Sequence, residues 1–216
     1  MAKQPPKRPA PRLYLVTPEV ADAQRFAREL EAALAAADVA AVLLRLKDAD
    51  ERTLINRVKA LATMTQRTDT ALVLDGYPDI VAHGGADGAH LTGIDEFEEA
   101  LDSLKPERIA GCGGLHTRHD AMAAAERGAD YVLFGEPEVD GLRPSFEAII
   151  ERIGWWAEVF EIPCVGYATS LDEIAPLVAA GADFVAVGDF IWADARGAAK
   201  AVADAAGQLA AAAEVA

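Results

Sequence analysis

Apolar and polar positions follow one another in blocks along the chain, so that short apolar runs alternate with longer segments of helical pattern. Most of the apolar runs are continuous rather than alternating, which is typical of parallel strands that are covered on both faces. The pattern predicts strands at residues 12–17, 40–46, 71–75, 88–91, 108–113, 131–135, 163–168 and 184–188. Helical segments lie between them, and the clearest predicted helices are 20–38, 118–130, 144–160 and 198–216.

The regular alternation of strand and helix indicates the fold class. Eight such alternations predict an α/β protein with a single (β/α)₈ TIM barrel of eight parallel strands, which spans residues 12–214 as one domain. A flavodoxin-like open sheet is the alternative, although it normally needs fewer strands. Residues 1–11 are basic and rich in proline but lack the apolar centre of a signal peptide, so we predict a disordered tail there.

A short phrase recurs along the chain: Gly-Ala-Asp, then an apolar run that ends at or near a glycine. It occurs at 128–135 and 181–188, and in a looser form at 85–93. Gly128 and Gly181 follow helical segments and are predicted to form their C-terminal caps, so the phrase marks equivalent turns from helix to strand. Gly135 and Gly188 fall at the C-terminal ends of strands, where barrel enzymes carry their chemistry. They are predicted either to bind a phosphate group or merely to allow a tight turn.

Net charge restricts the possible partners. The chain carries −15 overall, and residues 13–216 carry −19 once the four cations of the tail are set aside. Such a surface repels nucleic acid and anionic membranes, but it permits a phosphorylated substrate at a local site. No apolar run approaches the roughly 18 residues of a membrane span. Cys112 and Cys164 lie in apolar runs without disulfide or metal spacing, which predicts buried thiols in a cytoplasmic protein.

Two cations follow the second predicted strand. Arg45 and Lys47 are two residues apart, so on a strand their side chains point the same way. Two cations that face into a barrel need an anionic partner, and a diphosphate is one. The alternative is a pair of rim cations that Asp48 and Asp50 satisfy.

Carboxylates follow the third, fourth and sixth predicted strands. Asp75 and Asp95 could together hold Mg²⁺, which takes a few oxygen ligands and completes its shell with phosphate oxygens. Asp95 is also placed to cap a helix. Glu136 is a candidate catalytic base if burial raises its pKa, or else a solvated loop acid like Glu138. None of the histidines has metal-ligand spacing, and His90 is expected to be a hydrogen-bonded core residue.

The order and spacing of several segments resemble the thiamin phosphate synthases and the related thiazole tautomerases. The resemblance covers about residues 12–195 and rests on "RLYLVT", "VLLRLK", "LVLDG", "GADGAHLTGID", "GLHT", "GADYVLFG" and "GADFVAVGDFI". It implies a TIM barrel that joins hydroxymethylpyrimidine diphosphate to a thiazole phosphate with Mg²⁺ and releases diphosphate. It also implies that Arg45 and Lys47 bind the diphosphate and that Asp75 and Asp95 bind the metal.

Several positions depart from the pattern of that family. The family's Gln, Asn, Arg and Ser are replaced at Leu43, Leu74, Gly76 and Gly114. No lysine follows the sixth strand, although Arg143 could reach the same place.

The phosphate-binding Gly-Gly pair after the seventh strand is replaced as well, by the segment 167–169, and Asp189 stands beside Gly188. The tautomerases have a histidine at the position of Glu136. We therefore expect a thiamin phosphate synthase-like protein with a degenerate active site and weak or altered activity. Its ligands would be small phosphorylated heterocycles, and a homo-oligomer is compatible with the sequence. The alternative is a tautomerase-like enzyme or an inactive ligand-binding or regulatory protein.

Overall fold

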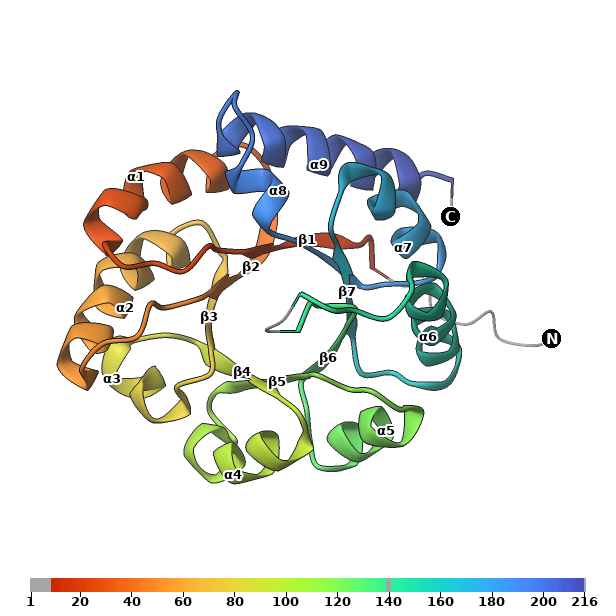
Figure 1. The fold of residues 1–216 in the computed structure, drawn as a ribbon, viewed down its shortest axis with the longest axis horizontal. Helices are drawn as coiled ribbons and strands as arrows, with labels where there is room; N and C mark the ends of the chain where they lie inside the picture. The colour runs from red at the N-terminus through yellow and green to blue at the C-terminus, as the bar shows by residue number, and fades with distance from the viewer. Residues whose placement is uncertain (1–8, 139–140, 216) are drawn as a thin grey trace.

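A closed barrel of parallel strands forms the centre of the molecule, and helices surround it (Figure 1). The computed structural model describes residues 9–138 and 141–215. Within these ranges, eight strands pair in sequence order and the last pairs with the first. They are β1 (Arg12–Val16), β2 (Val39–Leu44), β3 (Ala71–Asp75), β4 (Gly88–Thr92), β5 (Ile109–Gly113), β6 (Tyr131–Phe134), β7 (Cys164–Ala168) and β8 (Phe184–Val187). The predicted TIM barrel is confirmed, and the open flavodoxin-like sheet is excluded.

Helices and two 3₁₀ turns connect successive strands, and the last two helices follow β8. They are α1 (Ala23–Leu34), α2 (Glu51–Gln66), η1 (Pro78–Ile80), α3 (Val81–Gly84), α4 (Ile94–Leu104), α5 (Arg118–Glu126), α6 (Phe146–Val159), η2 (Leu171–Glu173), α7 (Ile174–Ala179), α8 (Asp189–Trp192) and α9 (Ala198–Ala213). The elements of the barrel thus run from Arg12 to Ala213, and residues 1–8 of the predicted tail lie outside the described residues. No helix in the described ranges is long and apolar enough to cross a membrane.

Alternate side chains along each strand build two layers of core. On β1, Leu13 and Leu15 face the helices, whereas Tyr14 and Val16 face the barrel axis. The inner layer is smaller; its buried members are Tyr14, Val16, Ala41, Leu43, Val73, Tyr131, Leu133, Val165, Tyr167 and Ala186. Because side chains fill the axis, ligands can bind only at the ends of the barrel.

The glycines that open the recurring phrase end their helices as expected. Gly128 has φ = 96° and Gly181 has φ = 100°, a left-handed conformation that costs glycine little. Each directly follows the helix C-cap residue, which is Arg127 or Ala180. The predicted turn is therefore present, and each glycine lies one residue after the C-cap position of its helix.

The aspartate of the phrase ties neighbouring strands together at the end of the barrel opposite the C-terminal strand ends. A side-chain oxygen of Asp87 accepts a hydrogen bond from the backbone N–H of Leu72 at 2.7 Å. Asp130 does the same for Ala110 at 2.7 Å, and Asp183 for Cys164 at 2.9 Å. The repetition of Gly-Ala-Asp thus has a structural cause, because each copy ends a helix and pins the preceding strand.

Replacement of Asp87 by Ala is expected to lower the free energy of unfolding by about 1.5 kcal/mol, because the buried N–H of Leu72 loses a charged acceptor. Urea unfolding followed by circular dichroism measures the change. Asp102→Ala on the exposed surface of α4 is the matched control and should stay within about 0.5 kcal/mol of the parent. Equal stability of the two variants would show that the Asp87 contact contributes nothing.

Candidate active site

An arginine and two carboxylates meet at the C-terminal ends of three strands. Arg45 comes directly after β2, and its Nε lies 3.6 Å from Oδ2 of Asp75 at the end of β3. Its Nη1 lies 3.9 Å from Oδ1 of Asp189, which follows β8. Both separations exceed a normal hydrogen bond, so the guanidinium keeps donors that a ligand can use. The partners of Arg45 are not Asp48 and Asp50, the pair considered from the sequence.

Lys47 lies beyond the end of β2 and is exposed. Strand β2 ends at Leu44, and Leu46 pairs with Val20 through an isolated bridge. Among the described residues, no ion pair includes the Lys47 ammonium. Asp50 instead caps α2, since its carboxylate accepts hydrogen bonds from the N–H and hydroxyl of Thr53. Lys47 is thus an exposed rim cation near Arg45 that has no ion pair with the residues described.

The two candidate metal carboxylates differ in their surroundings. Burial raises the pKa of Asp75, while Arg45 lowers it and Glu96 raises it further. Asp95 is exposed in the first turn of α4, where Gly93 rather than Asp95 is the cap residue. Within the described ranges, no group of three or more His, Cys, Asp or Glu side chains is arranged to hold a metal ion.

Glu136 follows β6 and reaches across to the end of β5. Its Oε1 accepts a short hydrogen bond from the backbone N–H of Gly114. A Cβ atom built on Gly113 would lie 2.3 Å from this oxygen and 2.6 Å from Nε2 of His90. Burial raises the pKa of Glu136 to about 7; the N–H of Gly114 lowers it, and Asp75 raises it. Glu136 therefore occupies a niche that exists because residue 113 has no side chain, unlike the exposed Glu138.

A chain of buried polar side chains continues from this niche along the barrel axis. Nδ1 of His90 lies 3.1 Å from the hydroxyl of Tyr131, which lies 2.7 Å from the hydroxyl of Tyr14. The expectation for His90 is confirmed, since it is a buried, hydrogen-bonded core residue whose pKa burial lowers to about 4. Alternate residues of β1 and β6 face the barrel axis, and this alternation is the sequence signal that could have predicted the inward position of the two tyrosines.

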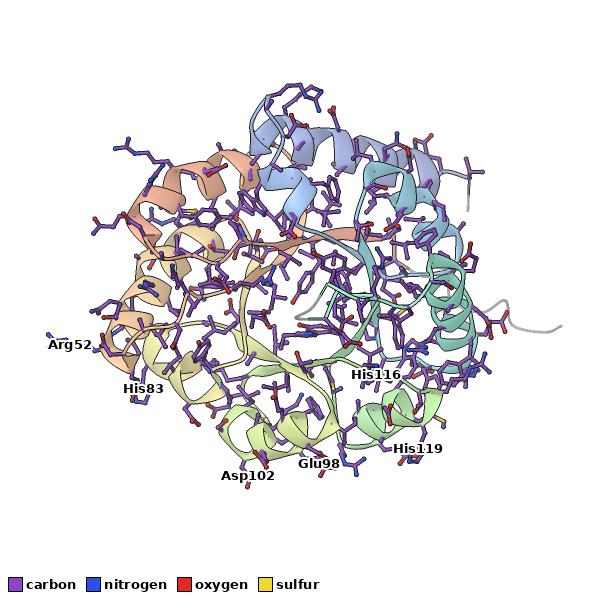
Figure 2. The ribbon with its side chains drawn as sticks, in the orientation of Figure 1. Arg52, His83, Glu98, Asp102, His116 and His119 are labelled. Atoms are coloured by element: carbon purple, nitrogen blue, oxygen red, sulfur yellow. The ribbon has the colours of Figure 1, made fainter. Side chains whose placement is uncertain are left out.

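The other histidines lie away from the axis. Figure 2 shows His83 and His119 on the outer helices α3 and α5, directed away from the barrel. His116 follows β5 and is also exposed, with Nδ1 3.9 Å from Oε1 of Glu138.

The glycines at the strand ends have packing roles. Gly135 has φ = 89°, and a Cβ atom there would lie 2.7 Å from Ile149 of α6. Gly188 has no left-handed φ, but a Cβ atom there would lie 2.6 Å from the hydroxyl of Tyr167. Tight packing thus accounts for both glycines, whether or not they also contact a ligand.

Arg143 binds the end of β7, where the family's Gly-Gly pair would lie. Its Nη1 donates to Oγ1 of Thr169 at 2.9 Å and to Oε2 of Glu173 at 3.2 Å. Glu173 was not recognised from the sequence, although Ser170-x-x-Glu173 has the spacing of a helix capping box.

Two surface hollows lie elsewhere. One, of about 380 Å³, lies between η2 and α9 and includes Leu171 and Asp204; the other, of about 410 Å³, lies between α1 and α2. Neither includes a strand-end residue, and Tyr167 fills part of the barrel mouth with its buried ring. Residue chemistry, rather than cavity size, therefore identifies the candidate site.

Comparison with known proteins agrees with the fold. The family described as "Thiamine monophosphate synthase" matches residues 13–191. The thiamine-phosphate synthase of Rhodospirillum centenum is 44% identical over 196 residues, which cover 89% of this chain and 95% of the relative. That of Hyphomonas neptunium is 36% identical, covering 86% and 87%. The thiamine phosphate pyrophosphorylase structure from Pyrococcus furiosus superposes with a TM-score of 0.78 at 23% identity, covering 93% and 96%. The chain belongs to the thiamine monophosphate synthase family.

Proposed function

We propose that this protein is a thiamine-phosphate synthase, which couples hydroxymethylpyrimidine diphosphate to a thiazole phosphate. In this reaction the ring nitrogen of the thiazole forms a bond to the methylene carbon of the pyrimidine. The bond between that carbon and the diphosphate oxygen breaks, and diphosphate leaves with the electron pair. The observation that carries the proposal is the contact of Arg45 with Asp75 at two adjacent strand ends, together with membership of the family.

Arg45 and Lys47 are proposed to bind the diphosphate of the first substrate. Arg45 is held in place by Asp75 and Asp189 at distances of 3.6 and 3.9 Å, which leaves its N–H donors available. Guanidinium groups bind phosphate oxygens in a bidentate manner, while the exposed Lys47 adds a point charge. The chain as a whole is strongly negative, and these two cations supply positive charge at the C-terminal end of β2.

Asp75 and Asp95 are proposed to hold Mg²⁺. The fit rests on Asp75, whose partly buried carboxylate lies 3.6 Å from the Arg45 guanidinium. Burial raises the pKa of Asp75, so a second cation would stabilise its charged form. Two carboxylates agree with the preference of Mg²⁺ for few protein ligands, with substrate phosphate and water as the others. When bound, the ion would neutralise charge on the departing diphosphate.

The β6, β7 and β8 ends are proposed to receive the thiazole phosphate. Gly135, Gly188 and Arg143 surround this side, and Arg143 supplies the positive charge. Small phosphorylated heterocycles are thus the proposed ligands, with no nucleic-acid or membrane partner. A cytoplasmic location and a homo-oligomer stay predictions.

A tautomerase-like reaction is the second candidate, and Glu136 favours it. A carboxyl group with a pKa of about 7 can both accept and donate a proton at neutral pH. Such a proton transfer would exchange a proton of the thiazole phosphate for deuterium in D₂O. The ¹H NMR signal of that proton would then disappear during the incubation. Glu136→Gln should abolish the exchange, since an amide cannot carry the proton.

A direct coupling assay with both substrates and Mg²⁺ tests the proposed function. We expect thiamine phosphate to form more slowly than about 1 s⁻¹, the low end of typical turnover numbers. The reason is that Leu43, Leu74 and Gly114 have no side-chain donor, whereas each oriented donor commonly contributes about 10²–10³ in rate, though not additively. Faster turnover would contradict the degenerate site, and no product at any substrate concentration would contradict the synthase assignment.

A further inference from the structure

A carboxylate of the chain itself occupies a set of donors at the end of β7. Oε2 of Glu173 accepts hydrogen bonds from the backbone N–H of Thr169 at 2.7 Å and from its hydroxyl at 3.0 Å. The same oxygen receives Nη1 of Arg143 at 3.2 Å. A backbone amide, a hydroxyl and a guanidinium are the donors that proteins commonly use for phosphate oxygens.

Arg143 is fixed in this cluster with donor capacity left over. Its side chain is 16% exposed and that of Glu173 is 19% exposed, so the pair is largely removed from water. Nη2 of Arg143 lies 3.5 Å from the carbonyl oxygen of Tyr167, a long contact. Nε of Arg143 is the one buried side-chain polar atom without a hydrogen-bond partner within the described ranges. Buried donors are normally satisfied, so this N–H is available to an additional acceptor.

We propose that Glu173 is a specificity-determining residue that fills an anion site formed by Arg143 and Thr169, and that the phosphate of the second substrate must displace it. The inference rests on the proposed function for the identity of that substrate. Glu173 then weakens binding of a phosphate group at the β7 end, because ligand and carboxylate compete for the same guanidinium and amide. The phosphate that replaces the carboxylate would also offer an acceptor to the unpaired Nε of Arg143.

A purely local role for Glu173 makes a different prediction. Ser170 is the cap residue of η2 but makes no side-chain cap hydrogen bond, and Glu173 reaches back to the backbone N–H of Thr169, one residue before the cap. Glutamine serves in a capping box as well as glutamate does. Glu173→Gln therefore keeps an acceptor for the N–H of Thr169 and removes the charge that faces Arg143.

Binding of inorganic phosphate to the whole protein, measured by isothermal titration calorimetry, provides the test. We expect Glu173→Gln to tighten phosphate binding roughly tenfold, and Glu173→Ala to do the same if the Gln variant folds poorly. The matched control Asp172→Asn removes an exposed neighbouring charge and should leave the affinity within about twofold. Adding Arg143→Gln to Glu173→Gln should eliminate the gain. An unchanged or weaker affinity in a folded Glu173→Gln variant, or a gain that survives Arg143→Gln, would overturn the proposal.

The coupling reaction separates this inference from the proposed function. Glu173→Gln should lower KM for the thiazole phosphate and leave KM for the pyrimidine diphosphate unchanged, since that substrate binds near Arg45. If phosphate binding tightens but no protein couples the substrates, the anion site stands and the synthase assignment fails. If coupling proceeds and phosphate binding does not respond, the synthase assignment stands and the role of Glu173 fails.

Discussion

Asp75→Asn is expected to lower kcat of the coupling reaction by about 10²–10³-fold. The variant keeps the size of the side chain but removes the charge that faces Arg45 and is proposed to bind Mg²⁺. Charge stabilisation of the leaving diphosphate then depends on the cations alone. Steady-state kinetics at saturating Mg²⁺ and substrates measures the change, and circular dichroism verifies the fold.

Asp79→Asn is the matched control for this prediction. Asp79 lies in η1, a few residues beyond Asp75, and its side chain is exposed. The control should retain kcat within about twofold, because a single exposed charge contributes little. Equal kcat for both variants and the parent would remove Asp75 from the mechanism.

Glu136→Gln is expected to change how stability depends on pH. Burial raises the pKa of Glu136 from an ordinary value of 4.5 to about 7, so the folded protein binds this proton more tightly than the unfolded chain. The resulting stabilisation is fully present below pH 4.5 and is lost as pH rises through about 7. Gln stays neutral, so the difference in unfolding free energy should move by about 3 kcal/mol in the variant's favour between pH 4 and pH 8.

Urea unfolding at several pH values measures this difference. Glu138→Gln is the control, because that carboxylate is exposed two residues further along the chain. Its difference from the parent should stay constant within about 0.5 kcal/mol over the same range. A constant difference for Glu136→Gln as well would mean that the niche at Gly113 does not hold a protonated carboxyl group.

The barrel could be predicted because strand and helix patterns are local. Continuous apolar runs bounded by Gly-Ala-Asp identify β6 and β8 almost to the residue. The predicted helix at 20–38 was too long at both ends, since Asp22 caps α1 and the apolar pattern continues past Leu34. Periodicity locates an element, whereas hydrogen bonds at its ends decide where it stops.

The site could be predicted only in part, because its contacts join distant segments. The strand-end rule placed Arg45 and Asp75 at one rim, and the structure brings them into contact. No local pattern links Tyr14 with Tyr131, which are 117 residues apart. The pairing of Arg143 with Glu173 likewise depends on how the segment after β6 lies across β7, which spacing does not determine.

Gly113 limits how this chain can change by mutation. The space that a methyl group would need there holds Oε1 of Glu136 at 2.3 Å and Nε2 of His90 at 2.6 Å. A substitution at 113 therefore requires both the Glu136 carboxylate and the His90 ring to move, and loss of the carboxylate removes only one of these two obstacles. The order in which these positions mutate then matters, because a side chain at 113 has room only after both Glu136 and His90 have changed.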